Sequence, residues 1–166
     1  MDKEMVKTLY FDDDGKIPNN VFYPLTLYRG VLKNQDAMDL FKKNNWTNAW
    51  ENGVFPYHHY HSNTHEVLGI AKGEASITFG GEKGETIHVK EGDVVVIPAG
   101  VGHKREQASS EFLVVGAYPN GRQHDLKTGK RDERPTVLEN IQHVPIPETD
   151  PVYGVDGPLI QSWKKR

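Results

Sequence analysis

The feature that most constrains this chain is a series of short β-like runs between Gly53 and Tyr118, separated by turn residues at intervals of roughly ten residues. The turns are rich in glycine, asparagine and serine, and no helical stretch interrupts the series. Evenly spaced short strands of this kind indicate an antiparallel barrel or sandwich. We therefore predict an all-β fold with its core at residues 53–118. The runs are VFPYHHYH, HEVLGIAK, EASITFG, ETIHVK, DVVVIPA, HKREQ and EFLVVGAY.

Residues 1–50 are expected to form an N-terminal extension of this core. One amphipathic helix is predicted near residues 35–44, with Asn34 as its N-cap. Its apolar positions are Ala37, Leu40 and Phe41, and Trp46 and Trp50 would extend the same face.

Residues 119–166 are expected to form a polar loop followed by an extended, proline-punctuated arm. An arm of this composition would pack on the barrel or on a partner subunit. We accordingly predict one domain over residues 1–166.

Composition narrows the classes of protein to which the chain can belong. The net charge of −3 has both signs interspersed, which argues against a nucleic-acid partner. The absence of cysteine excludes disulfides, thiolate metal sites and a cysteine nucleophile. The charged N-terminus does not resemble a signal peptide, and no apolar run reaches the roughly 18 residues of a membrane helix. A soluble, cytoplasmic protein is expected.

Four of the eight histidines lie in the stretch PYHHYHSNTHE, residues 56–66. A helix would place His61 and His65 on one face, but the proline, the two tyrosines and the turn-forming SNT disfavour a helix. On a strand, side chains alternate, so His59 and His61 would share a face and His58 would point away.

If this strand pairs with the next run across SNT, Glu66 is the expected companion of His59 and His61. A further ligand must come from another strand, and His103, just after a proline–glycine turn, is favoured over His88. Three imidazoles and one carboxylate suit one divalent transition metal ion, Fe, Mn, Ni, Co or Zn, with coordination positions left open.

The spacing of these residues resembles the two motifs of the cupin family. Gly53, His59, His61, Glu66 and Gly73 are spaced as in G-x5-H-x-H-x3-4-E-x6-G. Residues 92–103 are spaced as in G-x5-P-x-G-x2-H, which ends at His103. Further stretches, among them DDDGKIPNN, NNWTNAWENGVFPYHHYHSNTHEVLGI and DPVYGVDGPL, resemble the YjlB-type family of small bacterial cupins.

The resemblance implies a jelly-roll β-barrel (a double-stranded β-helix), frequently a homodimer, that holds a metal through His59, His61, Glu66 and His103. It leaves the reaction open, because cupins host many chemistries.

Several further residues are candidates for the site. Counted by twos from His103, Arg105 and Gln107 would also face inward and bind an anionic small molecule. Glu66 and Tyr118 are candidates for moving a proton. His65 is a possible additional ligand if a β-bulge at SNTHE turns it inward.

Other residues near the histidine cluster and in the polar loop are expected to have structural roles. His58 and Tyr60 are expected to pack between the barrel and the N-terminal helix or an interface. His124 and Asp125, in the polar loop, are candidates for a lid over the barrel mouth.

These observations favour a metal-dependent enzyme acting on a small molecule, of dioxygenase or isomerase type. The alternative is a non-catalytic module that binds a small metabolite or a sugar. A third reading is a dimer in which the metal only stabilises the barrel.

Overall fold

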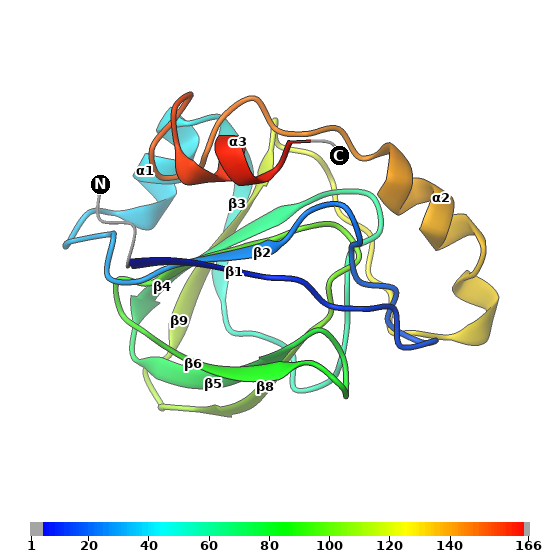
Figure 1. The fold of residues 1–166 in the computed structure, drawn as a ribbon. Coiled ribbons are helices and arrows are strands. Elements are labelled where there is room, and N and C mark those ends of the chain that lie inside the picture. The colour runs from blue at the N-terminus through cyan, green and yellow to red at the C-terminus, as the bar shows by residue number, and fades with distance from the viewer. Residues whose placement is uncertain (1–4, 165–166) are drawn as a thin grey trace.

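The computed structural model describes residues 5–164, and within them the strands form two antiparallel sheets that face each other (Figure 1). The larger sheet has six described strands in the order β1 (Val6–Leu9), β2 (Leu25–Tyr28), β7 (Val94–Ile97), β4 (Glu66–Lys72), β9 (Leu113–Pro119) and β3 (Trp46–Asn52). The smaller has three described strands in the order β6 (Glu85–Lys90), β5 (Glu74–Phe79) and β8 (His103–Ala108). The all-β prediction is confirmed.

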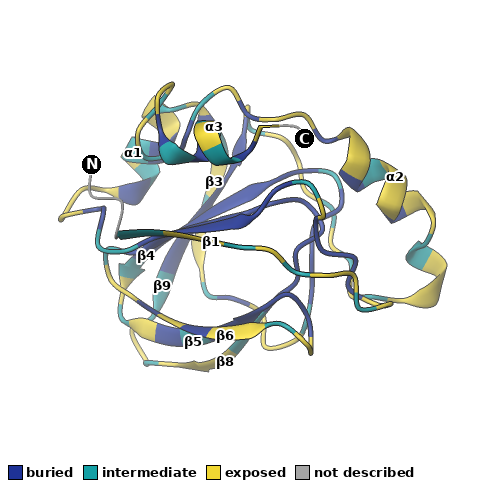
Figure 2. Cartoon of the chain, viewed as in Figure 1, coloured by how far each residue is buried: buried dark blue, intermediate teal, exposed yellow. Residues whose placement is uncertain are grey.

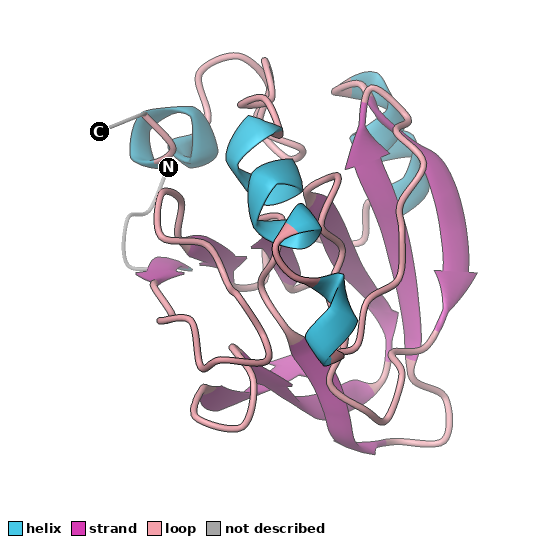
Figure 3. Ribbon diagram, turned by 90° about the vertical axis from the view of Figure 1, so that its right-hand side faces the viewer, coloured by secondary structure: helices cyan, strands magenta, loops and turns pink. Residues whose placement is uncertain are grey.

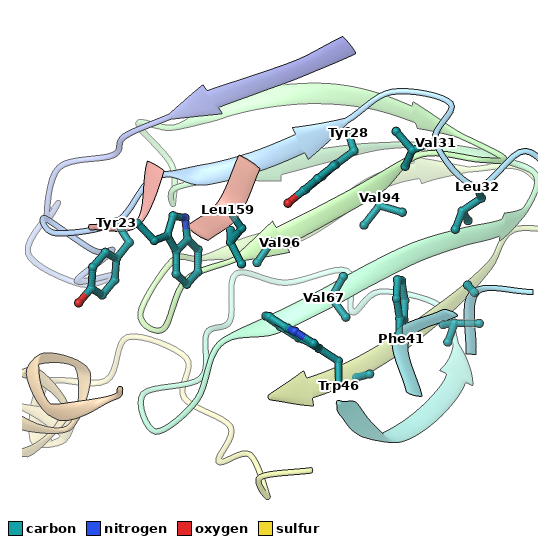
Figure 4. Close-up of a cluster of buried hydrophobic side chains, with 14 residues drawn as sticks. Tyr23, Tyr28, Val31, Leu32, Phe41, Trp46, Val67, Val94, Val96 and Leu159 are labelled. Carbon is teal, nitrogen blue, oxygen red and sulfur yellow. The ribbon is translucent and has the colours of Figure 1, made fainter. Parts of the chain in front are cut away.

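The central strands of the larger sheet, β2, β7, β4 and β9, are buried on both faces and are mostly dark blue in Figure 2, whereas the edge strands β1 and β3 are partly exposed. Toward the smaller sheet, Leu68 and Ile70 of β4 pack in one core with Ile77 and Phe79 of β5. On its other face a second core joins the larger sheet to the helices and the terminal segments; Figure 4 shows this cluster, including Tyr28, Phe41, Trp46, Val67, Val94, Val96 and Leu159. This double burial explains the apolar runs VVVI and EVLGI, which lack polar alternation.

The predicted helix is α1 (Ala37–Lys43), but its N-cap is Asp36, not Asn34. The Asp36 carboxylate accepts from the backbone N–H of Asp39 at 3.2 Å. Trp46 and Trp50 do not extend α1; they belong to β3, because Asn45 adopts a left-handed backbone conformation that ends the helix.

The C-terminal region corrects the expectation of a purely extended arm, because it contains helical segments. These are the 3₁₀ turn Arg131–Glu133, α2 (Thr136–His143) and α3 (Pro158–Ser162). Figures 1 and 3 show α2 on the outside of the sheets. Across residues 5–164, no helix has the length and apolar character needed to cross a membrane.

The arm packs on the chain's own barrel. Trp163 is fully buried, stacks on Tyr23 at 5.2 Å between ring centroids and donates to the Pro24 carbonyl. The buried Asp150 carboxylate accepts from the Tyr28 hydroxyl at 2.6 Å and from the Leu159 backbone N–H at 3.0 Å. The arm therefore covers the face of the larger sheet that lies away from the smaller sheet.

Candidate metal centre

The histidine-rich segment is not the regular strand that its alternation predicts. It does not form a hairpin with β4 across SNT; β4 lies between β7 and β9. Instead, isolated bridges pair His59 with His103 and Tyr60 with Lys127. The SNT turn is tied to a distant loop, since Asp125 accepts from the backbone N–H of Ser62 and donates its own to the Asn63 side chain.

Alternation nevertheless sorts the side chains as expected. His59 and His61 point toward the barrel interior, and both line its cavity. His58 lies on another face, beside Asp14 and Lys83. Tyr60 is fully buried as expected for a packing residue, but it packs on Ile17 and Val137 of α2 rather than on the N-terminal helix.

Three of the predicted ligands meet inside the barrel. Ligand atoms of His61, Glu66 and His103 all lie within 4.8 Å of one another, and all three residues are buried. The Nε2 atoms of His61 and His103 each lie 3.4 Å from Glu66 Oε1. Two atoms that share one ion at roughly 2.1 Å stand about 3 to 3.5 Å apart, so this spacing fits a common metal ion.

His59 lies beside this group rather than within it. Its ring centroid is 4.0 Å from that of His103 and 6.1 Å from that of His61. Burial, reinforced by His103, lowers the pKa of His59 to about 3, so the ring is neutral near pH 7. A neutral imidazole is the form that binds a metal.

The ring nitrogens of these three histidines are oriented alike. In each, Nδ1 faces a backbone carbonyl: Tyr57 for His59, Asp125 for His61 and Val101 for His103. A carbonyl only accepts, so Nδ1 carries a hydrogen, and in the neutral form of each ring Nε2 keeps its lone pair. Such a backbone contact is how metal-ligating histidines are commonly held.

His65 has the opposite arrangement. Its Nδ1 accepts from the Ala99 backbone N–H at 2.9 Å, and its Nε2 donates to the Pro145 carbonyl at 3.1 Å. Burial lowers the pKa of His65 to about 3. Both nitrogens are used by backbone groups, so no bulge turns His65 inward and it acts as a structural link to the C-terminal arm.

Glu66 and His61 are electrostatically paired. Burial alone would raise the pKa of Glu66, but His61 and His103 together hold it well below its usual range. Burial would likewise lower the pKa of His61, yet the Glu66 carboxylate raises it. Glu66 is therefore an anion at neutral pH, as a metal ligand must be.

The second oxygen of Glu66 is held by Tyr118. The Tyr118 hydroxyl donates to Glu66 Oε2 at 2.7 Å and accepts from Trp50 Nε1 at 2.8 Å. Burial and the neighbouring carboxylate raise the pKa of Tyr118. This chain of bonds leaves Glu66 Oε1 facing the histidines.

A cavity of about 520 Å³ opens above these groups. This volume is within the range of small-molecule sites. Arg105 lines it, as period-2 counting predicts. The described lining residues are Asn48, Ala49, Trp50, Glu51, Asn52, Gly53, Val54, Phe55, Pro56, His59, His61, Glu66, Leu68, His103, Arg105, Tyr118 and His124.

Gln107 does not reach the cavity, because β8 is bulged. Arg105 pairs with Ile77 but Gln107 pairs with Ser76, so Glu106 is an extra residue between the two pairs. An extra residue reverses the alternation of everything after it. Gln107 is accordingly exposed and lies on the face opposite Arg105.

The polar loop contributes more to the site than its composition indicates. His124 lines the cavity, stacks on Tyr118 with ring centroids 4.6 Å apart and meets the edge of His61 at 4.8 Å. Asp125 holds His61 through its carbonyl. The predicted lid residues thus lie at the site, one in its wall and one behind a ligand. The orienting role of Trp50 was missed; the sequence marks Trp50 only as an aromatic residue near the first motif glycine.

Comparison with known proteins gives the family. Residues 47–116 match the model of the Cupin domain. The chain is also 49% identical over 166 residues to the "Uncharacterized protein YjlB" of Bacillus subtilis (strain 168), covering 99% of this chain and 100% of that one. The chain belongs to the cupin family. The predicted cupin-type jelly roll and the likeness to YjlB are both confirmed.

Several solved structures are similar to parts of this chain at low sequence identity. A TDP-quinovose 3,4-ketoisomerase from Campylobacter jejuni is 17% identical, with 57% of this chain and 75% of that one covered and a TM-score of 0.44. An acireductone dioxygenase from Bacillus anthracis is 14% identical, with 53% and 59% covered and a TM-score of 0.39. A cupin-2 domain containing protein from Shewanella frigidimarina is 22% identical, with 62% and 76% covered and a TM-score of 0.35.

Proposed function

We propose that this cupin binds one divalent transition metal ion through His59, His61, Glu66 and His103 and acts as a metal-dependent enzyme on a small molecule. The observation that supports the proposal is the buried cluster of His61, Glu66 and His103. A carboxylate and neutral imidazoles form a donor set suited to Fe, Mn, Ni, Co or Zn.

The proposed role of the metal is to polarise a bound oxygen, or with iron to support dioxygen chemistry. The protein's own groups would do the rest. Tyr118 would hold Glu66 in place as an anion. Trp50 and Leu68 would exclude water, and Arg105 would orient an anionic group. Dioxygenase and isomerase chemistry are both compatible with this arrangement, and the consumption of oxygen during turnover distinguishes them.

The test is elemental mass spectrometry of untagged protein produced with iron, manganese, nickel, cobalt and zinc supplied. We expect close to one metal ion per chain in the wild type and a large loss in His61→Ala and His103→Ala. His88→Ala is the matched control, since His88 is exposed on β6. Metal far below one per chain in the wild type would contradict the proposal. Full occupancy in both ligand variants would contradict the ligand assignment.

Turnover separates an enzyme from a binding module. Candidate small molecules that stabilise the metal-loaded protein in thermal-shift assays are followed for oxygen uptake and product formation. We expect turnover that His103→Ala abolishes. Ligand stabilisation without turnover would favour the non-catalytic module. A cytoplasmic homodimer is proposed from the family resemblance, and light scattering of the purified protein tests its oligomeric state.

A further inference from the structure

The cavity contains one arginine that no other described side chain neutralises. Within residues 5–164, the Arg105 guanidinium forms no ion pair and no side-chain hydrogen bond, unlike Arg29, which pairs with Asp93, and Arg134, which pairs with Asp13. Arg105 is half-buried, and it is the single lysine or arginine among the described lining residues. A half-buried, unpartnered guanidinium favours an anionic ligand.

The other acids of the cavity wall do not occupy this arginine. Glu66 is engaged by His61, His103 and Tyr118. Glu51 pairs with Val115, whose side chain lies in the core on the far face of the larger sheet, so Glu51 points away from the interior. The charge that would complement Arg105 must therefore come from a ligand.

Two stacked aromatic rings lie next to this arginine. Phe55 and Tyr57 have ring centroids 5.1 Å apart and an interplanar angle of 10°, and they remain 47% and 41% exposed. The Arg105 backbone N–H donates to the Phe55 carbonyl at 3.0 Å, which fixes Phe55 beside Arg105. We call Phe55 and Tyr57 the aromatic ledge.

The aromatic ledge also touches the candidate metal centre. The His59 ring meets Phe55 edge-on at 5.1 Å and Tyr57 at 5.7 Å. Arg105 follows His103 by two residues on the same face of β8, a separation of roughly 6.5 to 7 Å along a strand. Cation, flat apolar surface and metal ligands are thus within the reach of one small molecule.

We infer that the substrate of this site is a small carboxylate with a flat, conjugated or aromatic body. This inference rests on the proposed function, since it names the molecule that the cavity takes. A single guanidinium fits the two oxygens of a carboxylate, whereas a phosphate site usually gathers several donors. A planar body gains from stacking on Phe55 and from the apolar walls of Trp50 and Leu68.

The test is calorimetric titration of the metal-loaded protein with three probes of similar size. Benzoate is flat and anionic, benzamide is flat and neutral, and cyclohexanecarboxylate is anionic but not flat. We expect benzoate to bind at least tenfold more tightly than either of the others. Equal binding of benzoate and benzamide would overturn the inference that the substrate is a carboxylate. Equal binding of benzoate and cyclohexanecarboxylate would overturn the inference that its body is flat.

Variants assign the preference to its residues. Arg105→Gln should abolish the preference for benzoate over benzamide while leaving metal content unchanged, and Arg105→Lys should restore part of it. Phe55→Ala should abolish the preference for benzoate over cyclohexanecarboxylate. Arg131→Gln, an exposed arginine outside the cavity, is the control. Unchanged benzoate affinity in Arg105→Gln would overturn the inference.

Metal content measured on the same samples distinguishes two failures. If the protein is fully loaded with metal but does not prefer benzoate, the inferred substrate class is overturned and the metal site stands. If the protein takes up no metal but still prefers benzoate, the inferred substrate class stands and the proposed function is overturned.

Discussion

The Glu66 carboxylate has two different neighbours, and each of its oxygens has a separate task. Oε1 faces His61 and His103, while Oε2 accepts from Tyr118. Because the Tyr118 proton is directed at Glu66, Tyr118 is better described as a positioning residue than as a free acid. Groups that orient a ligand in this way typically contribute 10- to 100-fold to metal affinity.

Replacing Tyr118 with phenylalanine removes this contact while keeping the ring. We expect Tyr118→Phe to fold and to bind metal roughly 10- to 100-fold more weakly. Competition titration against a chromophoric chelator measures the change. Tyr153→Phe, a hydroxyl deletion on an exposed tyrosine, is the control. Equal metal affinity in Tyr118→Phe and wild type would contradict the orienting role.

His65 should make stability depend on pH. Its folded pKa of about 3 lies below the ordinary 6.5, so the unfolded chain takes up the proton first. The contribution of neutral His65 is complete above pH 6.5 and is lost as pH falls toward 3. This loss amounts to about 2 kcal/mol between pH 7.5 and 5.

His65→Gln removes the titration but retains polar atoms. We expect the variant to be less stable than wild type at pH 7.5, by about 1 to 3 kcal/mol, and to lose less stability on acidification. Urea unfolding at a series of pH values measures both quantities. Parallel pH dependences for the two proteins would show that His65 is not held neutral.

At this scale the sequence predicts side chains wherever local alternation holds. His59 and His61 face the interior because they are two residues apart, although their segment is not a regular strand. The prediction that Gln107 faces inward is wrong because one bulged residue, Glu106, reverses the alternation of the side chains that follow it. The tautomer of His65 depends on Ala99 and Pro145, which lie far away in the chain, so no local pattern reveals it.

At the scale of elements, the contact between β3 and β9 depends on a glycine. A Cβ on Gly116 would lie 2.2 Å from the Trp50 indole, so glycine at this position lets the ring pack closely against β9. Trp50 in turn donates to Tyr118. The packing of two strands thereby sets the geometry beneath Glu66.

Gly116→Ala should displace the Trp50 ring. We expect a loss of about 1 to 3 kcal/mol in unfolding free energy and weaker metal binding, because overpacking moves the ring that holds Tyr118. Gly53→Ala is the matched control, since a Cβ there meets nothing within 4 Å. Denaturant unfolding and chelator competition provide the two readouts. A Gly116→Ala protein that behaves like Gly53→Ala would show that Trp50 can shift without cost.

Strands β4, β5, β7 and β9 follow from the sequence because each has apolar character between turn residues, whereas the more polar β6 and β8 follow from the turn residues on either side of them. The helices α2 and α3 do not, because prolines at 135, 145, 147 and 158 give the whole region the composition of an extended arm. Proline at the first turn of α3 is compatible with a helix, and the buried Leu159 shows that tertiary packing stabilises it.

At the scale of the whole molecule, the two faces of the larger sheet have different roles. The inner face carries Glu66 and Leu68 toward the cavity. The outer face is covered by α1 and the C-terminal arm, with Trp163 and Leu159 in its core. The arm therefore stabilises the sheet from the side away from the metal centre, and His65 is one of its links to the barrel.

This division predicts that stability and metal binding can be separated. Trp163→Ala removes a fully buried indole and its bond to Pro24, so we expect a loss of about 3 to 5 kcal/mol and faster proteolysis within residues 145–163. At low temperature, where the protein stays folded, the metal content should remain that of wild type. Val155→Ala, at an exposed position of the same arm, is the control and should change neither. If Trp163→Ala lost its metal while its circular dichroism spectrum stayed native, the arm would be coupled to the site through β4, and the two faces of the sheet would not be independent.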